Sequence, residues 1–245
     1  MNSLNTLESL GKHSLKIHIR VADQLGLAIV SGEYPQGSVL PTEQKLCQML
    51  GVSRTAMREA VRGLIAKGLI ESRPRVGTRV RESEYWNHLD PDVLRWRVEV
   101  TDTESYLRKM FQLRRATEPM ACAIAAEHAD AHDRAQLEAA FQAMVEAGDD
   151  NMLWVEADLA FHKAIYVATH NEFFWPIGQL FSFGLKEMFR IAARGSHRPR
   201  AIVEHRDILR AILERKPEMA RTASMTLLAN AAGDIRTIRE RELDR

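Results

Sequence analysis

The sequence predicts a mainly α-helical protein of two domains. Apolar residues recur at helical spacing through most of its 245 residues. Residues 69–80 differ, because a turn rich in Pro and Gly separates two short apolar segments, which is typical of a β-hairpin. Charge is also uneven: residues 1–81 carry a net +6, and residues 82–245 a net −5. The first domain is therefore the one suited to nucleic acid.

Length and composition limit the remaining classes. The chain is long enough for two hydrophobic cores. Its two cysteines, Cys47 and Cys122, fall in different predicted domains and give no disulfide framework, which fits a reducing compartment. No apolar run reaches the ~18 residues of a membrane span, and the N-terminus has no secretory pattern. We expect a cytoplasmic protein.

The N-terminal segment begins with residues 1–12, whose lack of periodicity predicts a loose arm. Residues 14–31 predict an amphipathic helix that Gly32 and Pro35 end. Its apolar positions are Leu15, Ile19, Ala22, Leu25, Ile29 and Val30.

Residues 40–66 predict two short helices joined by a tight turn. Thr42 can cap the first helix, Gly51 suits the left-handed residue that ends it, and Ser53 can cap the second. Val52 and Met57 have the spacing of a hydrophobic staple. The expected inward residues are Leu46, Met49 and Leu50 of the first helix and Met57, Ala60, Val61, Leu64 and Ile65 of the second.

The outward face of the second helix carries Arg54, Thr55, Arg58 and Arg62. Arginines four residues apart lie above one another on a helix. A capped helix that presents arginine forks has the shape and chemistry to read the DNA major groove. The alternative is an ordinary solvated basic face, and for Arg62 both interpretations stay open.

The hairpin after this helix supports a nucleic-acid role. Residues 73–77 form its turn, and Thr78 and Val80 return along the second strand. Residues 54–81 contain eight Lys or Arg against Glu59 and Glu71. A hairpin tipped with arginine is typical of a wing that touches the DNA backbone or minor groove.

The pattern L-P-T-E-x-x-L-C-x-x-L-G-V-S-R-T-A-M-R-E-A-V-R-x-L-x-x-x-G-L-I, followed by G-T-x-V, resembles the winged helix-turn-helix domain of the GntR family of bacterial transcription regulators. The resemblance implies that Arg54 and Arg58 contact an operator, helped by Ser53 and the wing. Gln44 stands where a well-known member has arginine. The predicted DNA-binding residues are Thr42, Gln44, Ser53, Arg54, Thr55, Arg58, Arg62, Arg75 and Gly77.

Residues 82–102 are predicted as a connector between a DNA-binding domain, 1–81, and a helical domain, 103–245. Trp86, Leu89 and Trp96 make it too apolar for a free tether, so we expect them to pack and tie the domains together. Its motif W-N-x-L-D-x-D-V-L-x-W is similar to one in sugar-acid regulators of the D-galactonate type.

The remaining chain predicts consecutive helices over 103–129, 132–148, 151–170, 172–194, 199–215 and 217–242. This region resembles the all-helical FCD effector domain of the FadR subfamily. In sequence terms the fold is therefore a winged helix-turn-helix domain followed by an all-α, FCD-like bundle for effector binding and dimerisation.

Asp158 and His162 are four residues apart on one helix face, and His205 belongs to a later helix. One carboxylate and two imidazoles suit Zn²⁺ or Ni²⁺, although such a pair can also be a simple surface hydrogen bond. The FCD resemblance implies a metal held by an aspartate and three histidines. Leu227 stands near the place of the third histidine, so the site has three protein ligands or no metal. Thr226 and Asn230, nearby, are poorer ligands.

Arg114 and Glu118 match the FCD pattern R-x-x-x-E. They form either a simple i, i+4 ion pair or a site where Arg114 binds an effector carboxylate, with Asn230 as a second candidate. Four histidines without evident partners are treated as incidental: His128, His132, His170 and His197. An aromatic group is expected in the core or at a dimer face: Phe173, Phe174, Trp175, Phe181 and Phe183.

These features together predict a transcription regulator, specifically a repressor of a sugar-acid catabolism operon. We expect a homodimer on a palindromic operator, released by a small hydroxycarboxylate. The same architecture could instead sense another organic acid or a fatty acyl thioester. A metal-dependent hydrolase is a more remote alternative, because the sequence shows no H-E-x-x-H, no G-x-S-x-G and no clear general base.

Overall fold

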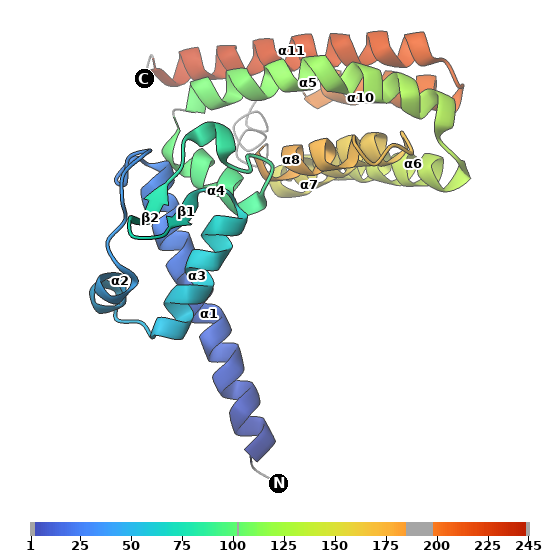
Figure 1. Cartoon of the computed structure of the whole chain (residues 1–245). Coiled ribbons are helices and arrows are strands. Elements are labelled where there is room, and N and C mark those ends of the chain that lie inside the picture. The colour runs from blue at the N-terminus through green and yellow to red at the C-terminus, as the bar shows by residue number, and fades with distance from the viewer. Residues whose placement is uncertain (1–2, 102, 185–197, 244–245) are drawn as a thin grey trace. The chain divides into compact units, whose positions relative to one another are not determined.

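The computed structural model describes residues 3–101, 103–184 and 198–243, and it confirms a mainly helical chain with one small hairpin (Figure 1). The chain divides into two compact units, Met1–Thr101 and Asp102–Arg245. Within the described ranges, no helix is long and apolar enough to cross a membrane.

The first unit contains α1 (Ser3–Val30), α2 (Glu43–Leu50), α3 (Arg54–Ala66), β1 (Ile70–Arg73), β2 (Gly77–Val80), the 3-10 helix η1 (Ser83–Tyr85) and α4 (Pro91–Val100). The two strands are antiparallel, with Ile70 opposite Val80 and Arg73 opposite Gly77. Helix α3 packs on α1, α2 and β1, and α4 packs on α1. This arrangement is the predicted winged helix-turn-helix fold.

The predicted helix ends are confirmed. The Thr42 hydroxyl accepts a hydrogen bond from the Lys45 amide at 3.3 Å, and the Ser53 hydroxyl accepts one from Ala56 at 3.2 Å. Gly51 ends α2 with a φ of 65°, a conformation that glycine adopts without steric cost. The tight turn that aims α3 is therefore encoded locally.

Four residues expected to pack are exposed instead, and one of them is Ile19 of α1, which is 51% exposed. Met49 is 58% exposed because α2 has only eight residues and turns one narrow stripe, centred on Leu46, toward its neighbours. Ile65 is 40% exposed on the last turn of α3, beside the fully buried Leu64. Leu89 is 50% exposed because it lies in the turn that the Asp90 amide closes onto the Asn87 carbonyl.

The prediction of a loose arm over residues 1–12 is wrong, because α1 begins at Ser3. No proline interrupts this segment, and Gly11 costs a helix only about 1 kcal/mol relative to alanine. The first residues of the chain can therefore be helical even though their apolar residues show no clear helical spacing.

The segment predicted as a connector packs into the first unit. Trp86 and Trp96 are buried with Val93 in the same core as α1 and α3. Trp96 lies against Gly26 of α1, where a Cβ atom would approach its indole ring to 2.4 Å. Helix α4 therefore rests on α1 at a position where only a residue without a side chain fits.

The second unit contains α5 (Thr103–His128), α6 (Ala131–Glu146), α7 (Asn151–Val167), α8 (Trp175–Gly184), α10 (Arg198–Leu213) and α11 (Pro217–Leu243). Helices α5 and α11 run side by side in opposite directions (Figure 1). Helices α6 and α8 pack on α7, and α10 contacts α5, α6 and α11. Side chains from α5, α7 and α10 thus meet inside this unit.

The aromatic segment departs from the prediction of a helix over 172–194. His170 has a φ of 51° and Asn171 begins a turn, so α8 starts only at Trp175. Phe173 is 80% exposed and Trp175 43% exposed, so neither is a core residue. The backbone of 185–194 and the side chains of Phe181 and Phe183 lie outside the described residues.

Candidate metal centre and nucleic-acid interface

Helix α3 presents one polar face to solvent. Arg54, Thr55 and Arg58 are exposed, while Ala56 and Met57 between them are buried. Burial of the apolar face fixes the rotation of the helix about its axis, and this rotation points the arginines outward. Thr42 and Gln44, at the start of α2, are exposed as well.

Arg62 differs from the two earlier arginines of α3. Its guanidinium lies 2.7 Å from the Glu59 carboxylate, and both side chains remain well exposed. Such an exposed pair contributes little to stability. Both interpretations of Arg62, a DNA contact and a solvated ion pair, therefore stay open.

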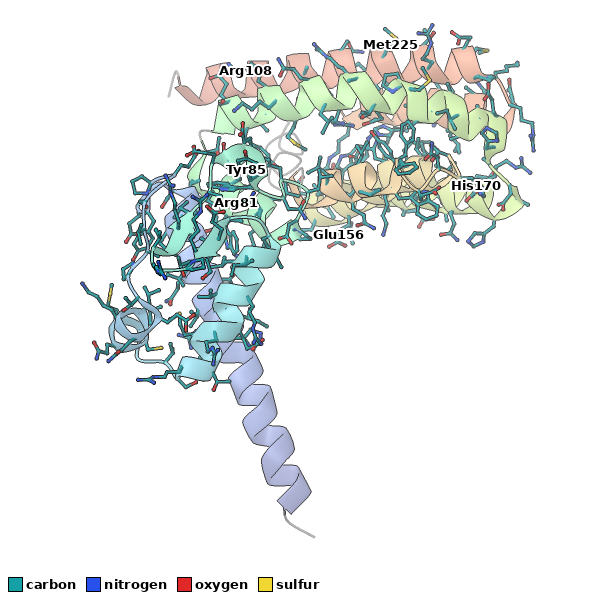
Figure 2. The ribbon with its side chains drawn as sticks, viewed as in Figure 1. Arg81, Tyr85, Arg108, Glu156, His170 and Met225 are labelled. Carbon is teal, nitrogen blue, oxygen red and sulfur yellow. The ribbon has the colours of Figure 1, made fainter. Side chains whose placement is uncertain are left out.

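The wing carries arginines with different roles. The Arg79 Nε donates to the Gly37 carbonyl at 2.7 Å, which holds the second strand to the loop after α1. Arg75 is exposed at the tip and has a φ of 66°, and Gly77 follows with a φ of 101°. Farther along, the Arg81 guanidinium lies 4.4 Å from the centre of the Tyr85 ring (Figure 2). Arg73 is exposed as well but pairs with Glu71 at 2.7 Å.

The second unit buries a polar cluster among three helices. Asp158 and His162 come from α7, His205 from α10, and Arg114 and Glu118 from α5. All five side chains are buried. Asp158 Oδ1 lies 3.1 Å from His205 Nε2, and the two Nε2 atoms of His162 and His205 lie 3.4 Å apart. The predicted triad is therefore assembled inside the protein and is not a surface hydrogen bond.

Each imidazole turns its Nε2 into the cluster. His205 Nδ1 lies 2.7 Å from the Ala201 carbonyl, which can only accept, so Nδ1 carries a proton and, in the neutral ring, Nε2 keeps the lone pair that a metal would need. His162 Nδ1 lies 2.8 Å from Glu118 Oε1, close but outside the angular range of a hydrogen bond. Partners of this kind orient metal-binding histidines.

Arg114 forms the predicted ion pair with Glu118 and also contacts the predicted metal ligand His162. Its guanidinium binds Glu118 at 2.9 and 3.2 Å and also lies 3.2 Å from His162 Nε2. Burial alone would raise the pKa of Glu118, but the charge of Arg114 lowers it well below its usual range. The ion pair is therefore part of the site and not a surface pair.

The charges of the triad support one another. Burial opposes ionisation of Asp158, but the neighbouring His162 and His205 lower the pKa of this carboxyl. Burial likewise opposes protonation of His205, but the hydrogen bond to Asp158 raises the pKa of the imidazole. The site favours a carboxylate beside a positive charge.

The residues present fit a divalent metal. Atoms of Asp158, His162 and His205 lie within 4.8 Å of one another, and none of the described residues donates a hydrogen bond to the buried Asp158 Oδ2. Leu227 is buried on α11 and supplies no ligand. Asn230 donates to Glu204 of α10, and Thr226 lines a groove of about 420 Å³ between α10 and α11. The structure thus assembles Arg114 with the triad and gives Asn230 a different partner.

The sequence did not predict the contact of Glu118 with His162 or the partner of His170. Glu118 contacts both Arg114 and His162, and its i, i+4 spacing from Arg114 was the available signal. His170 is not incidental, because its Nε2 lies 2.6 Å from Asp133, in a second group that includes Asp130 (Figure 2). Asp130 and Asp133 form a capping box at the start of α6, which explains their geometry.

Each of the two structural units matches a known protein family. Residues 18–80 match the family described as bacterial regulatory proteins, gntR family, and residues 109–230 match the FCD domain. The galactonate operon transcriptional repressor of Escherichia coli is 32% identical over 225 residues, which cover 89% of this chain and 96% of the repressor. The chain belongs to the GntR family of bacterial regulatory proteins. This GntR regulator combines a winged helix-turn-helix with an FCD domain, as the sequence predicted.

Other GntR relatives are consistent with this assignment. The E. coli HTH-type transcriptional regulator YieP is 37% identical over 163 residues, which cover 66% of this chain and 71% of YieP. The solved structure of Lar, which controls the expression of the Listeria monocytogenes agr system, matches with a TM-score of 0.62 and 20% identity over 90% of this chain and 96% of Lar. At that identity the structural match shows the fold alone.

Proposed function

We propose that this GntR regulator represses a sugar-acid catabolism operon. It would bind a palindromic operator as a homodimer in the cytoplasm and be released by a small hydroxycarboxylate. The galactonate operon repressor, similar over almost its whole length, supports the operon class. The buried contact among Arg114, His162 and Asp158 is the observation that carries the effector proposal.

The proposed metal is Zn²⁺ or Ni²⁺, held by Asp158, His162 and His205. The Nε2 atoms of both imidazoles lie close to Asp158 Oδ2, which accepts no hydrogen bond from the described residues. A carboxylate and two imidazoles suit borderline divalent ions. With three protein ligands, the ion would keep open positions for an oxygen-containing ligand.

The charge of the buried cluster explains why the effector would be an acid. Imidazoles that bind a metal are neutral, so apart from the ion Arg114 contributes one positive charge and Glu118 and Asp158 two negative charges, a net −1. A divalent ion changes the total to +1, and one carboxylate returns it to zero. Because uncompensated charge in a protein interior is costly, a metal and a monocarboxylate together leave the site balanced.

Arg114 would bind the acid after leaving His162. Its planar fork matches a carboxylate, and it already lies 3.2 Å from a metal-ligand candidate. Asn230 remains a second effector candidate, although it donates to Glu204. We propose no catalytic role for Glu118, because its lowered pKa makes it a poor general base at neutral pH.

Release of the operator by the effector would require only a small free-energy difference. A tenfold change in operator occupancy corresponds to about 1.4 kcal/mol of differential effector affinity between the operator-binding and released forms. By linkage, operator DNA must weaken effector binding by the same factor.

The test is a thermal-shift panel on the full-length protein with sugar acids, other hydroxy acids and acyl thioesters, followed by operator release with each ligand that binds. We expect sugar acids to raise the melting temperature, to do so less after chelation, and to weaken operator binding. Arg114→Lys keeps the buried charge but loses the fork, so it should reduce acid affinity more than operator affinity. Binding by acyl thioesters alone would contradict the acid proposal, and acids that bind without changing operator affinity would contradict the switch.

A further inference from the structure

Lys67 connects the C-terminal end of α3 to the segment after the wing. It is the residue after α3, and its Nζ lies 2.8 Å from both Asp90 oxygens and 2.8 Å from Asp92 Oδ2. Lys67 and Asp90 are only 19% and 18% exposed at their side chains, so solvent screens this contact less than a surface pair. Burial alone would lower the pKa of Lys67, but the bonds to Asp90 and Asp92 raise it.

The same carboxylates belong to α4. Asp90 is the N-cap of α4 and accepts from the Asp92 and Val93 amides. Arg95, one turn into α4, binds Asp92 at 3.2 Å and also binds Asp23 of α1. Lys67 thus pairs with both Asp90 and Asp92, Asp92 pairs with Arg95, and Arg95 pairs with Asp23. This ion-pair network links the end of α3 to α4, and α4 to α1.

Backbone contacts hold the same junction. The Asn87 amide donates to the Lys67 carbonyl at 2.9 Å. Gly68 has a φ of 76°, and a Cβ atom there would lie 2.3 Å from the Tyr85 carbonyl oxygen. The chain after the wing thus closes directly onto the end of α3, at a glycine that no other residue could replace without a shift.

This junction lies at the opposite end of α3 from the reading arginines. Thirteen residues at 1.5 Å each give α3 a length of about 20 Å. A tilt of roughly 5° at the Lys67 end would move the Arg54 end by about 2 Å, by the same helix geometry. Hydrogen bonds to base edges tolerate only a few tenths of an ångström.

We propose that Lys67 is a positioning residue for operator recognition: through Asp90, Asp92 and Arg95 it fixes the tilt of α3 on α1. Lys67 itself touches no DNA in this scheme. The residues that hold it, 87–95, lie outside the 18–80 segment matched by the gntR family model. The proposal depends on operator binding by the first unit and not on the metal or the effector.

The test compares Lys67→Met with wild type in the full-length protein, using operator DNA and a scrambled duplex over a range of salt. We expect operator affinity to fall about tenfold, with unchanged affinity for the scrambled duplex and an unchanged salt slope. Lys67→Arg should restore operator affinity, because a guanidinium can still bind both carboxylates. Lys109→Met, an exposed charge on α5, is the matched control and should bind as wild type.

Two results would overturn the proposal. Unchanged operator affinity would show that the network does not position α3. Equal loss on both duplexes, with a salt slope lowered by about one, would make Lys67 a phosphate contact. If Lys67→Met does not fold, Gly26→Ala replaces it: the added methyl pushes Trp96 of α4 away from α1 without changing any charge. That variant should lose operator preference in the same way, and retained preference contradicts the proposal.

Discussion

His162 and His205 approach each other within 3.4 Å through their Nε2 atoms, although 43 residues separate them in sequence. Two neutral imidazoles with converging lone pairs repel each other unless a proton or a metal ion lies between them. Asp158 stands beside both rings, 3.1 Å from His205 and 3.8 Å from His162. The pair is thus arranged around a shared positive charge.

Metal binding is the first prediction. Protein purified without chelator should contain one divalent ion per chain by elemental analysis, and Asp158→Asn should lose it because one of three ligands becomes neutral. Asp133→Asn, in the second carboxylate–histidine group, is the matched control and should retain the ion. Absence of metal after Zn²⁺ or Ni²⁺ supplementation would show that Leu227 marks a lost site.

Adding the missing ligand is the second prediction. Leu227 is buried on α11 near the place where the FCD resemblance puts a third histidine. Leu227→His should therefore raise metal affinity and lower effector affinity, because it closes a coordination position. Competition with a chelator and acid titration measure the two effects. Unchanged metal affinity in a folded variant would place residue 227 away from the ion.

Operator reading is the third prediction. Arg54→Ala and Arg58→Ala should each weaken operator binding by ~1–3 kcal/mol, because both side chains are exposed on the outward face of α3. Arg108→Ala, on α5 of the second unit, should bind as wild type. Fluorescence anisotropy against salt separates the roles, since loss of a phosphate contact reduces the salt slope by about one. Wild-type affinity in both α3 variants would contradict the assignment.

Acid sensitivity of the first unit is the fourth prediction. Burial opposes ionisation of Asp92, but Lys67 and Arg95 lower the pKa of this carboxyl. A lowered pKa in the folded state stabilises the fold above the ordinary pKa, and that stability is lost as pH falls through the folded value. Asp92 lies 2.8 Å from Lys67 and 3.2 Å from Arg95, and these two cations also bind Asp90 and Asp23.

The comparison is between wild type and Asp92→Asn, with melting temperatures measured by circular dichroism from pH 7 to pH 2.5. The variant should melt lower at pH 7, and the difference should shrink as pH falls below about 4. A difference that stays constant with pH would show that Asp92 is not stabilised by its charge.

The sequence by itself determined the local architecture. Caps at Thr42 and Ser53, the left-handed Gly51 and the turn at Gly77 depend on neighbours within a few residues, so they could be predicted from residue type and spacing. The outward face of α3 followed from helical periodicity. The failures within this part, exposed Met49 and Ile65, lie at helix ends, where periodicity says little about which neighbour covers a side chain.

Only the tertiary structure decided which distant side chains meet. Asp158 with His205, Glu118 with His162, and Lys67 with Asp90 each join different elements of the fold. Such contacts depend on how helices pack and rotate against one another, and that depends on many apolar contacts at once. Burial distinguishes these pairs from surface contacts. On a solvated helix, Arg114 and Glu118 at the same i, i+4 spacing would form an ordinary ion pair.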